Sequence, residues 1–228
     1  MGVLQVYWPV VFSVLTMLLM LFLDPARVTP FPPGLDLSGG QALRVLTSPV
    51  YFGHVLLLAA GLVWLAGFAR RANLPAEEHG SMVWWLTNIF WFHTACDLCS
   101  GYWQVMPLLT ELYAVMNPAH NAPRWAEARG HLDSCYVLEL VLEVPLAAWA
   151  FWLYARRDPA RHVVEAVAAA VQFAGTLIYY VPGLVKMESH CWLSWADRSC
   201  GAVWLVFPLL LLRRSLATAR AKAAGKAE

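Results

Sequence analysis

The sequence predicts an all-α membrane protein, a polytopic helical bundle of about six transmembrane helices. Its 228 residues are 60% hydrophobic and only 14% charged, and the mean hydropathy is positive. This composition is typical of membrane proteins rather than of soluble domains. A helix needs about 20 mostly apolar residues to span a bilayer. Six segments meet that need: 4–23, 50–69, 82–103, 134–155, 162–185 and 200–212, the last extended backward toward Cys191.

The first segment, 4–23, is expected to be an anchor helix. No basic residue precedes its apolar run and no small-residue cleavage pattern follows it, so it does not fit a signal peptide. Residues 24–49 are rich in Pro and Gly, which cannot continue a helix, and we expect an extended loop there. The chain is therefore divided into an anchor and loop (1–48), a transmembrane domain (49–214) and a charged C-terminal tail (215–228).

The connections between the later segments carry turn signals and charges. Asn117-Pro118 and Ala122-Pro123 separate short pieces that can be helical and can lie across one end of the bundle. Asp197 and Arg198 interrupt the last segment, which makes it the least regular of the six.

The positive charges predict how the bundle is oriented. With six spans, one side carries Arg70, Arg71, Arg156, Arg157, Arg161, Arg213, Arg214, Arg220, Lys222 and Lys226. The other side carries Arg27, Arg44, Arg124, Arg129, Lys186 and Arg198. Because cytoplasmic loops are richer in Lys and Arg, both termini are expected in the cytoplasm or its equivalent. The net charge is only +1, so nucleic acid is not an expected partner.

The five cysteines do not suggest a disulfide framework. Cys96, Cys99 and Cys135 fall in spans, where cysteine commonly acts as a small hydrophobic residue. Cys191 and Cys200 flank a loop on the expected non-cytoplasmic side, and a disulfide between them is an open alternative if that compartment is oxidising.

The aromatic residues divide into two groups. Residues near span ends fit an interfacial belt: Trp84, Trp85, Trp91, Trp103, Trp192 and Trp195. Deeper residues could line a pocket: Phe90, Phe92, Trp149, Phe173, Tyr179, Tyr180 and Trp204. For any single one of these, packing or contact with lipid is the simpler interpretation.

Four ionisable residues lie inside predicted spans. His93 and Asp97 are four apart on one span, and Glu139 and Glu143 repeat that spacing on the next, so each pair shares one face of its helix. Ionisable groups at membrane depth are costly and usually mark a functional site. A hydrogen-bonded cluster that only fixes helix packing is the alternative. Four such residues on neighbouring spans favour a ligand site.

Metal binding and ion transport are weaker interpretations of the same residues. A histidine, an aspartate and a glutamate could ligate a cation, but these spans have no second histidine at ligand spacing. No chain of ionisable groups continues through the later spans to make a proton or ion pathway. We therefore expect neither a metal nor a cofactor.

Four stretches resemble the emopamil-binding protein family, the EXPERA fold shared by sterol Δ8-Δ7 isomerase and the sigma-2 receptor. FWFHTACDLCSGYW resembles the isomerase helix in which a histidine is followed four residues later by an acid, here Asp97 instead of Glu. CYVLELVLEVPLAAWAF is closer to the sigma-2 receptor and aligns its binding glutamate with Glu139. RRDPARHVVEAVAAAVQFAGTLIYY and AVWLVFPLLLL resemble the remaining helices, the latter aligning Trp204 with a ligand-facing tryptophan.

The resemblance covers residues 49–214 and departs from the isomerase in places. Thr176 stands where the isomerase has Asp, and Gly201 stands where it has an asparagine. The spacing from glutamate to Pro145 also differs, which makes Glu139 the preferred glutamate and Glu143 its reserve. The resemblance implies a five-helix bundle of that family with an extra N-terminal helix.

The activity that the resemblance implies is a shift of a ring double bond in a sterol, without a cofactor. An acid protonates one alkene carbon, a carbocation forms, and a base removes a proton from a neighbouring carbon. His93 and Asp97 are expected to transfer protons, and Glu139 to stabilise the cation with cation-π support from Trp204. Further substrate-binding residues are expected to be Glu143, Thr176, Tyr179 and Trp103. Hydrophobic amines are expected ligands because a protonated amine mimics the cation.

Two rival functions stay open. One is a carrier that binds a sterol, another lipid or an amphiphilic amine without converting it. The other is an accessory subunit of a larger membrane complex, attached through the additional N-terminal helix. The resemblance implies an endoplasmic reticulum membrane location, with an organellar inner membrane as the alternative for a complex subunit. A homodimer is equally open.

Overall fold

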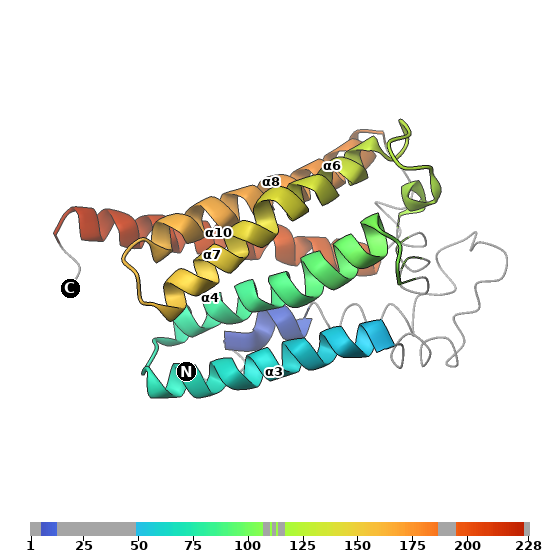
Figure 1. Cartoon of the computed structure of the whole chain (residues 1–228). Coiled ribbons are helices and arrows are strands. Elements are labelled where there is room, and N and C mark those ends of the chain that lie inside the picture. The colour runs from blue at the N-terminus through green and yellow to red at the C-terminus, as the bar shows by residue number, and fades with distance from the viewer. Residues whose placement is uncertain are drawn as a thin grey trace.

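Long helices lie side by side in the computed structural model, which describes residues 6–12, 49–106, 110, 113, 117–186 and 195–225 (Figure 1). The elements in chain order are α3 (Pro49–Arg71), α4 (Ala76–Thr87), η1 (Asn88–Tyr102), η2 (Pro118–Asn121), α6 (Gly130–Leu138), η3 (Glu139–Glu143), α7 (Val144–Ala155), α8 (Arg161–Val185) and α10 (Trp195–Ala223). Residues 6–12 are also helical. The described residues contain helices and no strand, which confirms the all-α class.

Successive helical runs are antiparallel neighbours. α4 continues directly into η1, and α6, η3 and α7 form a second continuous run. Short connections at 72–75 and 156–160 reverse the chain at one end, and η1 ends and α6 begins at the other (Figure 1). Chain connections this short place sequential helices next to each other.

Four helices within the described residues are long and apolar enough to cross a membrane: Phe52–Arg71, Gly130–Ala155, Arg161–Val185 and Gly201–Ala223. The predicted span 82–103 is helical, as α4 and η1, but is not among these four. The anchor predicted at 4–23 falls outside the described residues except for 6–12. The disulfide considered for Cys191 and Cys200 also lies outside the described side chains.

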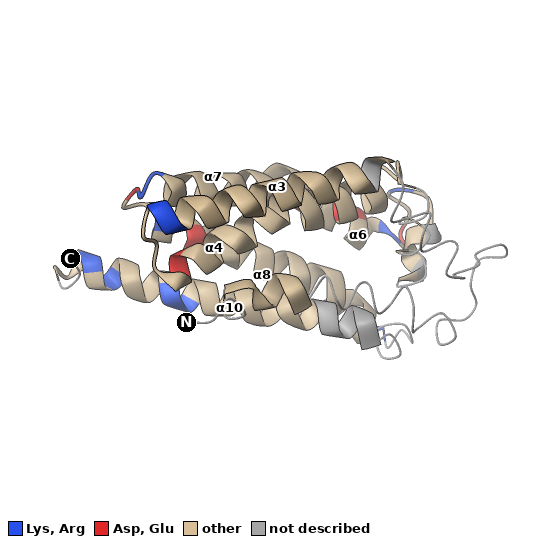
Figure 2. Ribbon diagram, turned by 90° about the horizontal axis from the view of Figure 1, so that it is seen from below, with Lys and Arg blue, Asp and Glu red and all other residues tan. Residues whose placement is uncertain are grey.

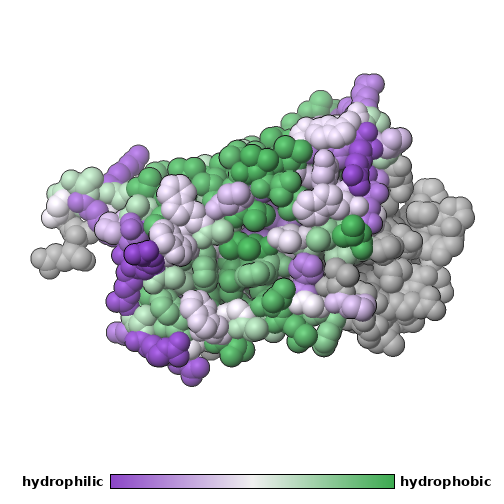
Figure 3. Space-filling view, viewed as in Figure 1, coloured by the Kyte–Doolittle hydropathy of each residue, from purple (hydrophilic) through white to green (hydrophobic). Residues whose placement is uncertain are grey.

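The outer surface fits this membrane assignment. Figure 3 shows a broad hydrophobic middle between hydrophilic ends. Large apolar side chains such as Val63, Trp149 and Val185 are exposed on it. Exposure of this kind is expected when the surrounding solvent is lipid.

Two segments of the bundle are π-helical, and together they contain the four ionisable residues that the sequence places inside predicted spans. η1 extends over 15 residues and η3 over five. The Ser100 hydroxyl donates to the Ala95 carbonyl, and the Thr94 hydroxyl to the Ile89 carbonyl, each five residues back. Pro145 follows η3 and has no N–H to close the preceding turn. Such wide turns are rare and often coincide with functional sites.

A buried ion pair joins helices at the end where α4 and α8 begin. The Glu165 carboxylate accepts hydrogen bonds from Tyr154 Oη at 2.6 Å and Trp85 Nε1 at 3.2 Å, and pairs with Arg214 Nη2 at 2.6 Å. Ser215 also donates to it. Because these donors come from three helices, α4, α7 and α10, the fully buried Glu165 fixes how these helices pack on α8.

A second buried ion pair closes the opposite end. Arg129 pairs with Asp133 at 3.0 Å and donates to the carbonyls of His120 at 2.8 Å and Gly101 at 2.9 Å. Asp133 in turn accepts from the Trp125 backbone N–H at 2.6 Å. The guanidinium therefore attaches η2 and its loop to the end of η1.

Candidate functional site

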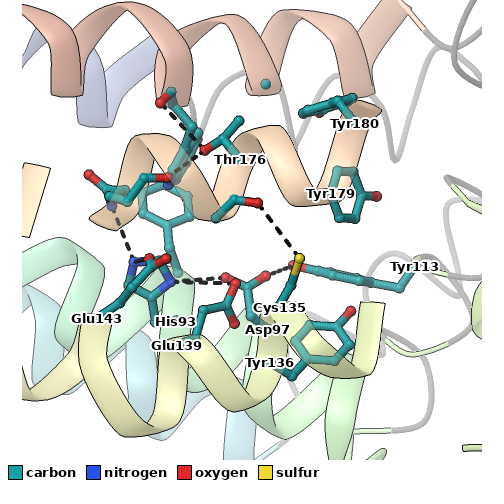
Figure 4. Close-up of a pocket in the computed structure, with 15 residues that line it drawn as sticks. His93, Asp97, Tyr113, Cys135, Tyr136, Glu139, Glu143, Thr176, Tyr179 and Tyr180 are labelled. Carbon is teal, nitrogen blue, oxygen red and sulfur yellow. Dashed lines mark hydrogen bonds and ion pairs between the residues drawn. The ribbon is translucent and has the colours of Figure 1, made fainter. Parts of the chain in front are cut away.

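A cavity of about 130 Å³ lies between η1, the α6–η3 run, α8 and α10. Figure 4 shows the side chains that surround it. Its lining residues are Phe92, His93, Asp97, Tyr113, Cys135, Tyr136, Glu139, Glu143, Gln172, Gly175, Thr176, Tyr179, Tyr180, Gly201 and Trp204. All four ionisable residues singled out from the sequence are among them.

His93 is the centre of the polar side of the cavity. Its ring Nδ1 lies 3.3 Å from Asp97 Oδ2 and 3.9 Å from Glu139 Oε1. Its Nε2 lies 3.1 Å from Glu143 Oε2. The side chain is only 3% exposed, so three carboxylates surround one imidazole with little solvent between them (Figure 4).

A series of hydrogen bonds from Trp84 through Gln172 reaches Nε2 of the His93 ring. Trp84 Nε1 donates to Gln172 Oε1 at 3.0 Å, which turns the Gln172 amide nitrogen toward Asn88 Oδ1 at 2.8 Å and His93 Nε2 at 3.2 Å. An indole N–H can only donate, so it determines the orientation of the amide. Nε2 can accept from Gln172 when unprotonated and donate to Glu143 when protonated. The site therefore accommodates both states of this ring nitrogen.

Tyr113 holds Asp97. Its hydroxyl donates to Asp97 Oδ1 at 2.6 Å, leaving Oδ2 toward His93. Burial first, and the neighbouring Asp97 carboxylate second, raise the pKa of the Tyr113 phenol well above its usual range. The phenol therefore stays protonated and acts as a donor. Sequence analysis did not single out Tyr113; the only signal was its place in a helical piece expected to lie across one end of the bundle.

Of the two glutamates, Glu143 makes the closer contact with His93, although the sequence comparison preferred Glu139. Glu143 is 5% exposed and lies against α8 at Gly175, where the absence of a side chain admits its carboxylate. Glu139 is less buried and is farther from the ring. The structure thus brings both glutamates to the histidine, one on each ring nitrogen.

Aromatic side chains form the opposite wall. The Trp204 ring lies 4.5 Å from that of Phe92 in an edge-on arrangement and 5.5 Å from that of Trp84. Thr176 donates its hydroxyl to the Gln172 carbonyl at 3.0 Å, and Tyr179 lines the cavity beside it. Trp204, Thr176 and Tyr179 thus line the same cavity, and their role in binding a substrate stays a prediction.

Trp103 does not line this cavity. It follows η1 with its side chain 41% exposed and its ring 6.3 Å from that of Tyr102. The reason is its position past the end of η1, which takes it beyond the level of His93.

Several lining residues had no distinct signal in the sequence. Cys135 and Tyr136 reach the cavity from α6, and Tyr136 Oη lies 3.3 Å from a ring nitrogen of His120. A Cβ at Gly201 would meet the phenol of Tyr180, so that ring takes the room beside α10. Only the distances between helices reveal these relationships.

Comparison with known proteins relates nearly half of the chain to one protein family. Residues 111–215 match the family EBP, described as EXPERA (EXPanded EBP superfamily). This stretch, 105 of the 228 residues, is similar to an EXPERA domain. No curated protein and no solved structure matches the chain.

The matched residues of the EXPERA domain include Glu139, Glu143, Thr176, Tyr179 and Trp204. His93 and Asp97 precede them on η1 and complete the cavity from outside the matched stretch. The family resemblance is thereby confirmed for residues 111–215, and the chain is an integral membrane protein.

Proposed function

We propose that this protein is a membrane-embedded sterol isomerase that moves a ring double bond by protonation and deprotonation. The observation that carries the proposal is one buried imidazole contacted by three carboxylates and faced by an aromatic wall. Membership of the EXPERA superfamily supports a hydrophobic ligand inside the membrane. The resemblance to the isomerase suggests the endoplasmic reticulum as its location.

Proton transfer is assigned to Asp97 and His93. The acid form of this pair adds a proton to one alkene carbon, and the resulting carbocation loses a proton from an adjacent carbon to the base form, so no proton is consumed overall. Tyr113 holds Asp97 in place through Oδ1, while Oδ2 lies 3.3 Å from His93 Nδ1. Gln172 and Glu143, which contact Nε2 at 3.2 Å and 3.1 Å, keep the imidazole oriented for these roles.

Cation stabilisation is assigned to the glutamates and Trp204. Three carboxylates against one imidazole give the polar side of the cavity an excess of acidic groups, which favours positive charge. The Trp204 and Phe92 rings offer cation-π contacts from the other wall. The same features favour protonated hydrophobic amines.

The size of the cavity sets how a sterol can enter. An engineered protein cavity of about 150 Å³ binds benzene, and this one is of similar size, about 130 Å³. It therefore suits the reacting ring rather than a whole sterol. The remainder of the molecule must displace lining side chains or extend into the bilayer.

A second candidate is a binding protein for sterols or amphiphilic amines. The acidic excess and the aromatic wall fit a protonated amine as well as they fit a carbocation. This function predicts the same dependence on Asp97 and Glu139 for binding, without product.

Conversion of an 8-ene sterol by the purified full-length protein tests the proposal. We expect turnover by the natural protein and a decrease of about 100-fold or more in Asp97→Asn and Glu139→Gln, the size expected for loss of proton transfer or charge stabilisation. Trp149→Phe, on the exposed surface, is the matched control and should retain turnover.

Two outcomes contradict the assignment. Turnover at the natural rate in both Asp97→Asn and Glu139→Gln would show that these two carboxylates take no part in the reaction. Saturable sterol or amine binding without any product would favour the binding protein instead.

A further inference from the structure

Three potential ligand atoms converge at the polar side of the cavity. His93, Asp97 and Glu139 each offer one nitrogen or oxygen, and these atoms all lie within 4.8 Å of one another. Within the described part of the chain this is the one such cluster of three histidine, cysteine or acidic side chains. It joins η1 to η3 at the point where both depart from α-helical geometry.

The distances fit a small metal ion. Zinc binds nitrogen and oxygen ligands at about 2.0–2.2 Å, which separates two ligand atoms by roughly 3.3–3.5 Å at a tetrahedral angle. His93 Nδ1 lies 3.3 Å from Asp97 Oδ2 and 3.9 Å from Glu139 Oε1. The three ligand atoms lie within 4.8 Å of one another, so binding an ion requires the Glu139 side chain to move closer to the other two.

Two buried atoms of the cluster lack hydrogen bonds. Among the described residues, His93 Nδ1 has no partner of hydrogen-bonding geometry despite its proximity to Asp97, and Glu139 Oε2 has none at all. Buried polar atoms are almost always satisfied, and exceptions often mark an ion or water position. A proton on Nδ1 would satisfy that nitrogen but leave Glu139 Oε2 unchanged, whereas an ion between the side chains can engage both residues.

Partners outside the cluster orient the ligands. Glu143 Oε2 lies 3.1 Å from His93 Nε2, so this nitrogen can donate to a carboxylate while Nδ1 faces the cluster. Tyr113 donates to Asp97 Oδ1 at 2.6 Å and leaves Oδ2 available. A carboxylate behind a ligating histidine and a donor behind a ligating carboxylate are recurrent supports of metal sites.

We propose that His93, Asp97 and Glu139 bind a divalent transition-metal ion of the zinc class, with a further coordination position open to the cavity. Two carboxylates balance the charge of a dication, and one imidazole with two carboxylates suits such a metal. The ion lies where the transferable proton of the isomerase would lie. Metal binding and isomerisation therefore exclude each other at this site, and zinc acts as an inhibitor.

Metal titration of the chelator-treated, full-length protein in detergent tests this site directly. Co²⁺ serves as a coloured probe, and we expect one equivalent to bind per chain with the visible absorption of a four-coordinate site and to be displaced by Zn²⁺. His93→Ala and Asp97→Asn should each weaken binding by at least about 100-fold, and Glu143→Gln by about 10–100-fold as an outer support. Cys99→Ser, which changes a free cysteine of η1 that does not line the cavity, should bind as the natural protein does.

Three results would overturn the site: no stoichiometric Co²⁺ or Zn²⁺ binding, binding that persists in a folded His93→Ala variant, or sulfur among the ligands. X-ray absorption of the zinc-loaded natural protein provides the ligand set without a variant, and should show nitrogen and oxygen only. Metal binding is read without sterol, and isomerisation is read in the presence of chelator. A negative result for metal binding therefore does not decide whether the protein is an isomerase, and a negative result for isomerisation does not decide whether it binds a metal.

Discussion

Glycines decide how closely functional side chains approach the helices that line the cavity. A Cβ at Gly175 of α8 would meet Glu143 Oε1, and one at Gly201 of α10 would meet the Tyr180 phenol. Family resemblance aligns an asparagine of the isomerase with Gly201. The structure shows why glycine is accommodated there, since the Tyr180 ring takes the space of a side chain. Single hydrogen atoms at these two positions thus shape two walls of the site.

Gly175→Ala should displace Glu143 from His93. We expect a decrease in sterol turnover of about 10–100-fold, because small misplacements near a reacting centre have effects of this order. The free energy of unfolding should decrease by no more than about 1–3 kcal/mol, the usual range for overpacking, offset in part by the better helix propensity of alanine. Turnover and unfolding in detergent check the two effects.

Gly53→Ala is the matched control. It changes a glycine of α3 whose Cβ would have no atom within 4 Å, so turnover should remain unchanged and stability should stay equal or increase. Equal turnover in the natural protein and Gly175→Ala would show that the position of Glu143 does not matter for the reaction.

At the scale of elements, the site is positioned by the two π-helical segments and by the buried Arg129, which attaches the loop after η1. Both pairs of ionisable residues lie where the helix widens, so their directions differ from those of a regular α-helix. Arg129 then attaches the loop after η1 to the start of α6 through Asp133 and two carbonyls. The end of the bundle next to the cavity depends on this one guanidinium.

Arg129→Met should strongly destabilise the protein. It leaves the fully buried Asp133 carboxylate without its charge partner, which typically costs about 3–5 kcal/mol. Denaturant or thermal unfolding in detergent measures the change. Arg124→Met removes an exposed guanidinium that donates to the Trp103 carbonyl and lies over the Tyr102 ring, and should change stability by no more than about 1 kcal/mol. Equal midpoints for the two variants would contradict the role given to Arg129.

At the scale of the whole molecule, charge is distributed unequally between the two ends. The end with the connections 72–75 and 156–160 carries Arg70, Arg71, Arg156, Arg157 and Arg161, and the basic residues of α10 lie toward it, as Figure 2 shows. The opposite end carries Arg124, Arg129 and Lys186 among the described residues. The positive-inside rule predicts that the first end faces the cytoplasm.

Single cysteines test this orientation. In a variant whose native cysteines are replaced, Gly225→Cys should react at once with a membrane-impermeant maleimide in sealed microsomes, whose cytoplasmic face is outside. Glu127→Cys, in the loop at the opposite end, should react only after detergent is added. The cysteine-free protein reports background labelling. The reverse pattern would invert the predicted topology.

The sequence by itself determined the class of the protein and singled out the four ionisable residues of the cavity. Apolar runs of spanning length predict membrane helices, and the four-residue spacings of His93 with Asp97 and of Glu139 with Glu143 place each pair on one helix face. These are local properties, because helix periodicity relates residues within one segment. The family resemblance pointed to Trp204 in the same way, through local motifs.

Tertiary structure decided which of these side chains meet. Distances between helices determine that Glu143 approaches His93 more closely than Glu139 does and that Tyr113 donates to Asp97. They also determine that Trp103 does not line the cavity. Those distances follow from glycines that admit close packing, from two widened helical turns and from buried ion pairs at both ends of the bundle. Spacing along the chain contains none of this information, since packing between segments arises only when the whole bundle forms.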